Sequence, residues 1–148
     1  MYKVCPNCGI PSFKVIADAV LFNLNNTIQT PEKQNNWQIC MNTKCDISYF
    51  SDKVHYTIKD LKHALFFKDE SPNTFICYCS QITRGEIKEA VNQGCKNVKQ
   101  VRDLLNKNNK CECKTKHPLG KCCCSSFDFE IKKELKNKPL IFKYNPQQ

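Results

Sequence analysis

The residues of this sequence that can do chemistry are its 12 cysteines, most of which fall into short-spaced groups. Near the N-terminus, Cys5 and Cys8 are separated by two residues, and Cys40 and Cys45 by four. Thiolates in two such pairs are typical of a closed tetrahedral zinc site, which leaves no open position for a catalytic water. We therefore predict a structural zinc ion held by Cys5, Cys8, Cys40 and Cys45. The alternative is a set of buried cysteines without metal.

A second group of cysteines begins with Cys77 and Cys79, which flank Tyr78, and continues far along the chain with Cys113 and the run Cys122–Cys124. A one-residue spacing lets both thiols of an extended or looped segment point the same way. A helix that starts soon after Cys79 would place its first amides near anionic sulfurs. Four thiolates commonly hold a [2Fe–2S] cluster. Although the spacing differs from the usual ferredoxin patterns, the two thiolate groups favour a buried iron–sulfur cluster.

The segments around the first group are predicted to be strands. Residues 37–39 and 47–50 alternate apolar and polar residues on either side of the second cysteine pair, which predicts a hairpin with zinc at its turn. Val54–Ile58 alternates again and should be a further strand. Phe13–Leu24 fits a strand followed by a second strand or a short helix, and the polar segment Asn25–Asn36 fits a loop.

Between and after the cysteines of the second group, the sequence predicts three helices. Thr83 and Glu86 form a capping box, and Gly94 is placed to end the first helix. Asn97 is the predicted cap of the second helix, and a third should begin after the cysteine run. The expected buried positions of these helices are Ile87, Ala90 and Val91, then Val98, Val101, Leu104 and Leu105, then Phe127, Phe129, Ile131 and Leu135, with Pro139 as the stop.

These elements predict an α+β fold in which a small β-rich zinc-binding subdomain packs on a helical [2Fe–2S]-binding subdomain. The expected boundaries are residues 1–72 for the first, 73–138 for the second and 139–148 for a tail, with a linker at Lys68–Asn73. Trp37, Tyr49 and Phe50 are expected in the core. His55 and His63 are isolated and are expected to be structural rather than metal ligands.

Composition narrows the class of protein. The net charge of +9 would suit binding to nucleic acid. A DNA-binding helix pair does not need cysteines at both of its ends, however, so nucleic acid is disfavoured as a partner. No apolar stretch has the length needed to cross a bilayer, and the start has no signal-peptide pattern. Cysteine clusters in such a chain favour a metal-binding protein in the reducing cytoplasm. No nucleophile–base set or phosphate loop is present, which favours an electron-transfer or metal-binding protein over a turnover enzyme.

The cysteine pattern also carries a family resemblance. Cys77-Tyr-Cys79 with Thr83-Arg-Gly-Glu-Ile87, followed after a long gap by Cys113, is similar to bacterioferritin-associated ferredoxins. From Val4 to Leu135 the chain resembles the N-terminal domain of CopZ-type copper chaperones. The shared features are Cys-Pro-x-Cys, a central cysteine pair before Tyr-Phe, Cys-Tyr-Cys, and a Pro-x-Gly-Lys turn before Cys-Cys.

The resemblance implies one zinc ion and one [2Fe–2S] cluster. It assigns zinc to Cys5, Cys8, Cys40 and Cys45. It assigns the cluster to Cys77, Cys79, Cys113 and either Cys123 or Cys122, and Cys123 is preferred because it lies nearest the start of the third helix. Cys111 and Cys124 are extra thiols beside the cluster, and Cys95 is an expected core residue.

The function expected from this resemblance is a one-electron carrier or reductant linked to copper trafficking. Its partner would be an electron donor or acceptor protein or a copper-trafficking protein. The lysines around the C-terminal ligands would attract an acidic docking face; they are Lys107, Lys110, Lys114, Lys116 and Lys121. The alternative for these lysines is that they only reflect the composition of the chain. The alternative is a metallochaperone module that takes up copper(I) through its surplus cysteines. CopZ-type chaperones carry copper on a Met-x-Cys-x-x-Cys loop, and neither Met1 nor Met41 begins one, so that activity is not carried over.

Overall fold

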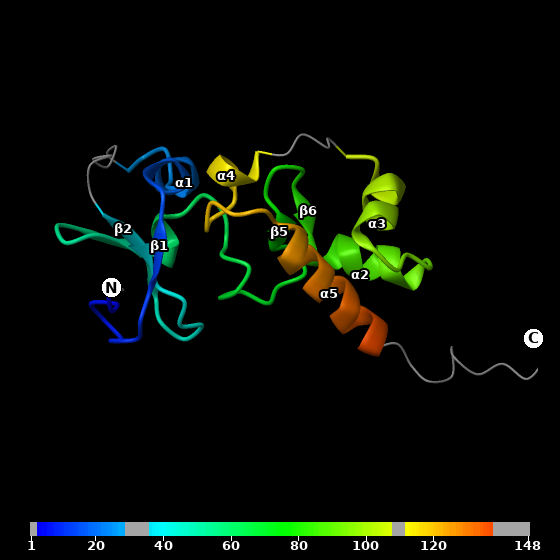
Figure 1. Ribbon diagram of the computed structural model, residues 1–148, viewed down its shortest axis with the longest axis horizontal. Helices are drawn as coiled ribbons and strands as arrows, with labels where there is room; N and C mark the ends of the chain where they lie inside the picture. The colour runs from blue at the N-terminus through cyan, green and yellow to red at the C-terminus, as the bar shows by residue number, and fades with distance from the viewer. Residues whose placement is uncertain (1–2, 29–35, 108–111, 138–148) are drawn as a thin grey trace, which may run out of the picture.

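The N-terminal half of the molecule is built on a four-stranded antiparallel sheet with the strand order β1-β2-β3-β4. The computed structural model describes residues 3–28, 36–107 and 112–137. Figure 1 shows the sheet at the N-terminal end of an elongated molecule, with α1 beside it. The strands are β1 (Phe13–Val15), β2 (Trp37–Ile39), β3 (Ile47–Phe50) and β4 (His55–Thr57).

The segment after β1 is a helix, α1 (Ala17–Asn23), so the second of the two predicted alternatives is correct. It buries Ala19 and Val20, and its end is joined to the rest of the half by a bridge between Leu24 and Leu61. The predicted hairpin is confirmed, because β2 and β3 pair directly on either side of the second cysteine pair. The strand predicted at Val54–Ile58 is β4, which is followed by the 3-10 helix Ile58–Asp60.

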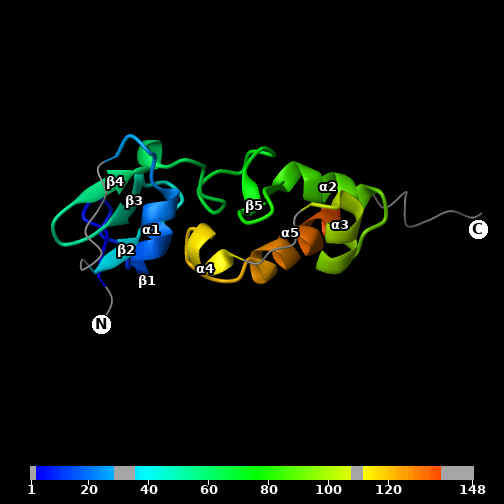
Figure 2. The same cartoon turned by 90° about the horizontal axis from the view of Figure 1, so that it is seen from above.

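The described residues of the C-terminal half form a short two-stranded sheet and four helices. Figure 2 shows these helices from above. The strands are β5 (Phe75–Cys77) and β6 (Ile82–Thr83). The helices are α2 (Arg84–Asn92), α3 (Val98–Leu105), α4 (Cys113–Lys116) and α5 (Cys124–Asn137). Among the described residues, none of these helices combines the length and the apolar character that a membrane span requires.

The helix starts follow the predicted caps. Thr83 and Glu86 form the reciprocal capping box of α2, and the side chain of Asn97 accepts a hydrogen bond from the Gln100 amide at the start of α3. Gly94 follows α2 with a φ of 110°, a left-handed conformation that favours glycine. These local signals were sufficient to locate both helices.

Two predicted core positions are wrong. Phe129 is 66% exposed and Leu104 is 46% exposed. In α5, Phe127 and Ile131 are four residues apart and share the buried face. Phe129 is two positions after Phe127 and is therefore rotated by about 200° around the helix axis, toward solvent. The short helix α3 buries only Val101 fully, and its Leu104 lies at the edge of a groove between α2 and α3. The short helix α4 was not predicted, and Pro139 lies outside the described residues.

The two halves are connected by more than the chain between them. The Tyr49 hydroxyl donates a hydrogen bond to the carbonyl of Pro118 (2.5 Å), and α4 packs against α1. The ammonium of Lys68 donates to the carbonyl of Cys45 (2.8 Å), and the guanidinium of Arg84 donates to the carbonyl of Asp69 (2.7 Å). The predicted α+β fold is therefore confirmed. The expected linker is hydrogen-bonded to both halves, and the boundary at residue 72 stays a prediction.

Candidate metal centres

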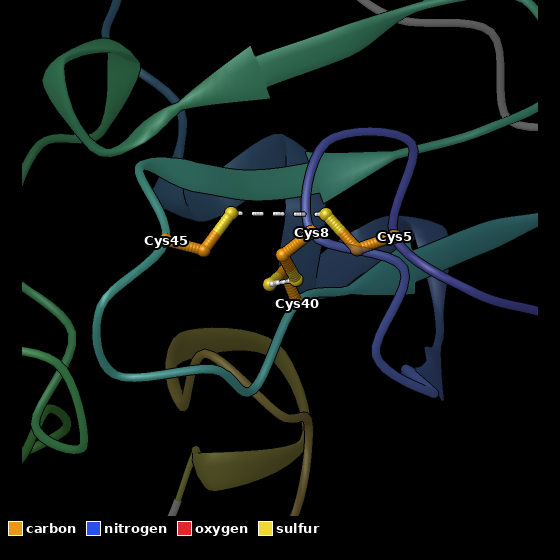
Figure 3. Close-up of side chains that lie close together, drawn as sticks. All are labelled: Cys5, Cys8, Cys40 and Cys45. Atoms are coloured by element: carbon orange, nitrogen blue, oxygen red, sulfur yellow. Dashed lines mark hydrogen bonds between the residues drawn. The ribbon is translucent and has the colours of Figure 1, made fainter.

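The first cysteine group comes together at one end of the N-terminal sheet (Figure 3). Cys5 and Cys8 lie in a loop that the pairing of Val4 with Pro11 closes, and Cys40 and Cys45 lie between β2 and β3. All four sulfurs are within 4.8 Å of one another. The Sγ atoms of Cys5 and Cys45 are 3.8 Å apart, as are those of Cys8 and Cys40. This is a compact set of four soft donors around one point.

Amide groups around the sulfurs hold this arrangement. The backbone amide of Asn7 lies 3.4 Å from Cys5 Sγ, and its side-chain Nδ2 lies 3.4 Å from Cys45 Sγ. Gly9, with a φ of 74°, supplies the left-handed turn after Cys8. Such donors compensate the negative charge of metal-bound thiolates and orient them. Asn7 therefore connects the two pairs of ligands.

The surroundings of the four thiols lower the pKa of some of them and raise the pKa of others. A hydrogen bond from the Ile10 amide is the main cause that lowers the pKa of Cys8 to about 6. Burial raises the pKa of Cys40 to about 12. At neutral pH the group already holds thiolate, and metal binding must displace the remaining protons. The affinity of this site for metal should therefore increase with pH.

The second cysteine group is assembled from three separate segments. Cys77 ends β5 and Cys79 follows in the next turn, Cys113 is the first residue of α4, and Cys123 directly precedes α5. The Sγ atoms of Cys79 and Cys113 are 3.3 Å apart, and the thiol of Cys123 hydrogen-bonds Cys77. The sulfurs thus meet as two pairs. In the part of the chain that the structure describes, only the first group has all its sulfurs mutually within 4.8 Å.

Arg102 of α3 lies against one of these pairs. Its Nη2 atom is 3.5 Å from Cys77 Sγ and 3.4 Å from Cys123 Sγ, and its guanidinium lies over the ring of Phe127. The hydrogen bond from Cys123 is the largest cause that lowers the pKa of Cys77 to about 4; burial opposes it, and the Ser80 amide and Arg102 reinforce it. The Arg102 cation therefore stabilises negative charge on Cys77.

The remaining cysteines have different surroundings. Cys123 is 1% exposed, whereas Cys122 and Cys124 on either side of it are exposed. Cys122 accepts hydrogen bonds from the amide and the thiol of Cys124, so these two surface sulfurs face each other. Cys95 is buried in the C-terminal core, as expected. Cys111 lies outside the described residues.

Sequence reasoning missed two residues beside the second group, Arg102 and His117. His117 follows α4 and is 2% exposed. Its Nδ1 accepts a hydrogen bond from the Leu119 amide (3.1 Å), while Nε2 has no hydrogen-bond partner among the described residues. Burial lowers its pKa to about 4, so the ring is neutral at physiological pH. The only sequence signal for His117 is its place in the turn between two candidate ligands. His55 and His63, by contrast, are exposed.

The second group fits a two-iron cluster. Each iron of such a cluster takes two protein ligands, and its sulfides carry negative charge that hydrogen-bond donors stabilise. The structure supplies two pairs of sulfurs, the cation of Arg102, and one buried imidazole N–H without an acceptor. A single zinc ion requires the compact geometry of the first group instead.

Fold and sites together define a cysteine-rich metal-binding protein with a zinc site of four thiolates. Residues 2–62 match the family model of the CopZ zinc binding domain. The structure is similar to the X-ray structure of the Archaeoglobus fulgidus CopZ N-terminal domain, with a TM-score of 0.70 at 19% sequence identity. This match covers 85% of the present chain and 95% of the other, so the likeness in fold extends beyond the zinc-binding region. No curated protein matches the chain.

Proposed function

We propose that this chain is a zinc and [2Fe–2S] protein that acts as a one-electron carrier or reductant linked to copper trafficking. The observation that carries the proposal is the second cysteine group, in which three separate segments bring the sulfurs together as two pairs, one of them in contact with Arg102. A zinc site alone would not require these residues. The metal-binding character of the chain does not depend on this proposal, because it rests on the first group and its family match.

Cys77, Cys79, Cys113 and Cys123 are the proposed cluster ligands. Cys123 is preferred to Cys122 because its sulfur is buried against Cys77, whereas that of Cys122 is exposed. When bound there, a [2Fe–2S] cluster supplies a one-electron couple whose potential depends on hydrogen bonds, local charge and exposure.

The residues around the site favour electron transfer over storage. The cation of Arg102 favours the more negative, reduced state. The core packed on these cysteines, including Ile76 and Phe127, excludes water. Cys79 is the ligand that is not fully buried, so the electron would pass to and from partners near this residue. The first group, with four thiolates and no open position, has a structural role in this proposal.

A protein partner with an acidic surface remains part of the proposal, with a narrower docking site than the sequence implied. Lys107 is paired with Glu86, and Lys116 is paired with Glu112. Lys114 and Lys121 are exposed near the ligands Cys113 and Cys123, and Lys110 lies outside the described residues. An acidic electron-transfer or copper-trafficking protein in the cytoplasm would dock on this surface.

A second candidate function is copper(I) binding by the surplus cysteines. The observation that favours it is the contact between Cys122 and Cys124, two exposed thiols next to a proposed ligand. Thiolates select soft ions such as copper(I). In this candidate the chain is a metallochaperone module, and copper adds to zinc and iron instead of replacing them.

Metal and sulfide analysis of anaerobically purified protein, with electron paramagnetic resonance of the reduced form, tests the proposal. We expect about one zinc and two irons per chain, as the two sites require. Cys123→Ala should lose iron and retain zinc, and the matched variant Cys122→Ala should retain both. Zinc without iron or sulfide would refute the redox function. Copper(I) binding that Cys122→Ala abolishes without loss of iron would favour the second candidate.

A further inference from the structure

The segments that carry the proposed cluster ligands hold His117 in place. The His117 amide donates to the carbonyl of Cys113 (3.0 Å), and the Gly120 amide donates to the carbonyl of His117 (2.8 Å). The imidazole packs against the ring of Tyr78, with centroids 5.8 Å apart, and Tyr78 lies between Cys77 and Cys79. The ring therefore contacts one ligand segment while its backbone is bonded to another.

The hydrogen bond to Nδ1 determines where the imidazole carries its proton. Because Nδ1 accepts from the Leu119 amide, the neutral ring must carry its hydrogen on Nε2. That N–H is buried and has no acceptor among the described residues. A buried donor without a partner is unfavourable and rare in folded proteins. The fold therefore leaves one buried N–H group for an acceptor other than the described protein atoms.

The nearby hydroxyl groups do not meet this need. The Tyr78 hydroxyl donates to the carbonyl of Ala64 (2.6 Å) and accepts from the Phe66 amide (3.1 Å). The Tyr49 hydroxyl donates to the carbonyl of Pro118. The charged groups that act on the His117 imidazole are Cys77, which raises its pKa against the larger effect of burial, and Lys121, which lowers it.

We propose that the Nε2–H of His117 donates a hydrogen bond to a sulfur of the [2Fe–2S] unit and thereby raises its reduction potential. The inference rests on the proposed function. A neutral donor stabilises the more negative reduced state without adding a charge. His117 is thus a positioning and tuning residue that comes from a different element than Arg102 of α3, and it is not itself a ligand.

Pulsed electron paramagnetic resonance on the reduced protein tests this contact directly. Histidine labelled with nitrogen-15 is introduced into His55→Gln/His63→Gln protein, in which His117 is the remaining histidine of the three. Because both replaced residues are exposed, we expect normal iron content and a weak coupling from one imidazole nitrogen. Absence of coupling would overturn the inference, and so would a strong coupling, because it would make His117 a ligand.

Reduction potentials provide the second readout. His117→Phe retains a ring without the N–H, and His63→Phe makes the same change at an exposed ring that lies on Phe75. We expect His117→Phe to lower the equilibrium constant for reduction about tenfold, which is a fall in potential of ~59 mV for a one-electron couple. His63→Phe should leave the potential unchanged. His117→Gln, which keeps an N–H donor, should show a smaller fall in the reduction potential than His117→Phe.

Each outcome distinguishes this inference from the proposed function. If the unsubstituted protein holds no iron, the proposed function fails first. If iron is present and His117→Phe has the potential of the unsubstituted protein, the function stands and the inference is wrong. If His117→Phe does not fold, the nitrogen coupling in the labelled protein decides.

Discussion

Replacing Arg102 with Met should lower the reduction potential of the proposed cluster. The substitution retains most of the side-chain volume over the Phe127 ring but removes the charge that lies 3.5 Å from Cys77 Sγ and 3.4 Å from Cys123 Sγ. At effective dielectric constants of about 20–40, a unit charge at such a distance interacts with another by roughly 2–5 kcal/mol. The electron added on reduction lies beyond the sulfurs, so about 1–3 kcal/mol should distinguish the two oxidation states. This corresponds to a fall of roughly 45–130 mV for one electron.

The assay is anaerobic voltammetry of protein with verified iron content. Lys99→Met is the matched control, because it lies on the same helix and removes the same charge. Its side chain is 84% exposed and is paired with Asp103. Solvent and salt screen such a charge, so the control should shift the potential by less than about 20 mV. Arg102→Lys, which keeps the charge, should lie between the control and Arg102→Met.

The reasoning would be refuted if Arg102→Met and Lys99→Met shifted the potential equally, or if Arg102→Met raised it. Either result would mean that the guanidinium does not interact with the added electron. The visible spectrum serves as a check on cluster integrity in each variant.

Three further predictions concern stability and metal content. Cys40→Ser should lose zinc and destabilise the N-terminal half, measured by metal analysis and thermal unfolding, because structural zinc contributes folding free energy directly. Arg84→Met should lower the free energy of unfolding in urea by about 3–5 kcal/mol, since it leaves the buried Glu130 carboxylate without its cation. Against the effect of burial, the hydrogen bond from Lys107 keeps the pKa of Glu86 below its ordinary value. The ionised Glu86 carboxylate therefore contributes stability at neutral pH, and this contribution is lost as the pH falls through the lowered pKa. Glu86→Gln should accordingly lose less stability on acidification than the unsubstituted protein.

Much of the fold was predictable because its signals are local. The caps at Thr83 and Asn97 are satisfied by neighbours three residues away. The hairpin whose turn carries Cys40 and Cys45 follows from the alternation of apolar and polar residues on both sides of that turn. Such patterns can be recognised without knowledge of distant contacts.

What could not be predicted depends on contacts between distant segments. Arg102 lies 25 positions from Cys77 in the sequence, and its contact with that sulfur is set by the packing of α3. The burial of Arg84 depends on carbonyl groups of the preceding segment and on Glu130 of α5. A cationic residue in a lysine-rich chain gives no sign of such a role, because most of its kind are exposed.

The hydrogen bond from Tyr49 to the carbonyl of Pro118 has a consequence for the biogenesis of the protein. Tyr49 lies in β3, directly after the second pair of zinc-site cysteines, and Pro118 lies in the turn between Cys113 and Cys123. The turn that brings two of the proposed iron ligands into place is therefore attached to the sheet that zinc organises. If the proposed cluster is present, maturation should follow an order in which zinc is acquired first and iron second, so that zinc-starved cells would accumulate a chain without iron.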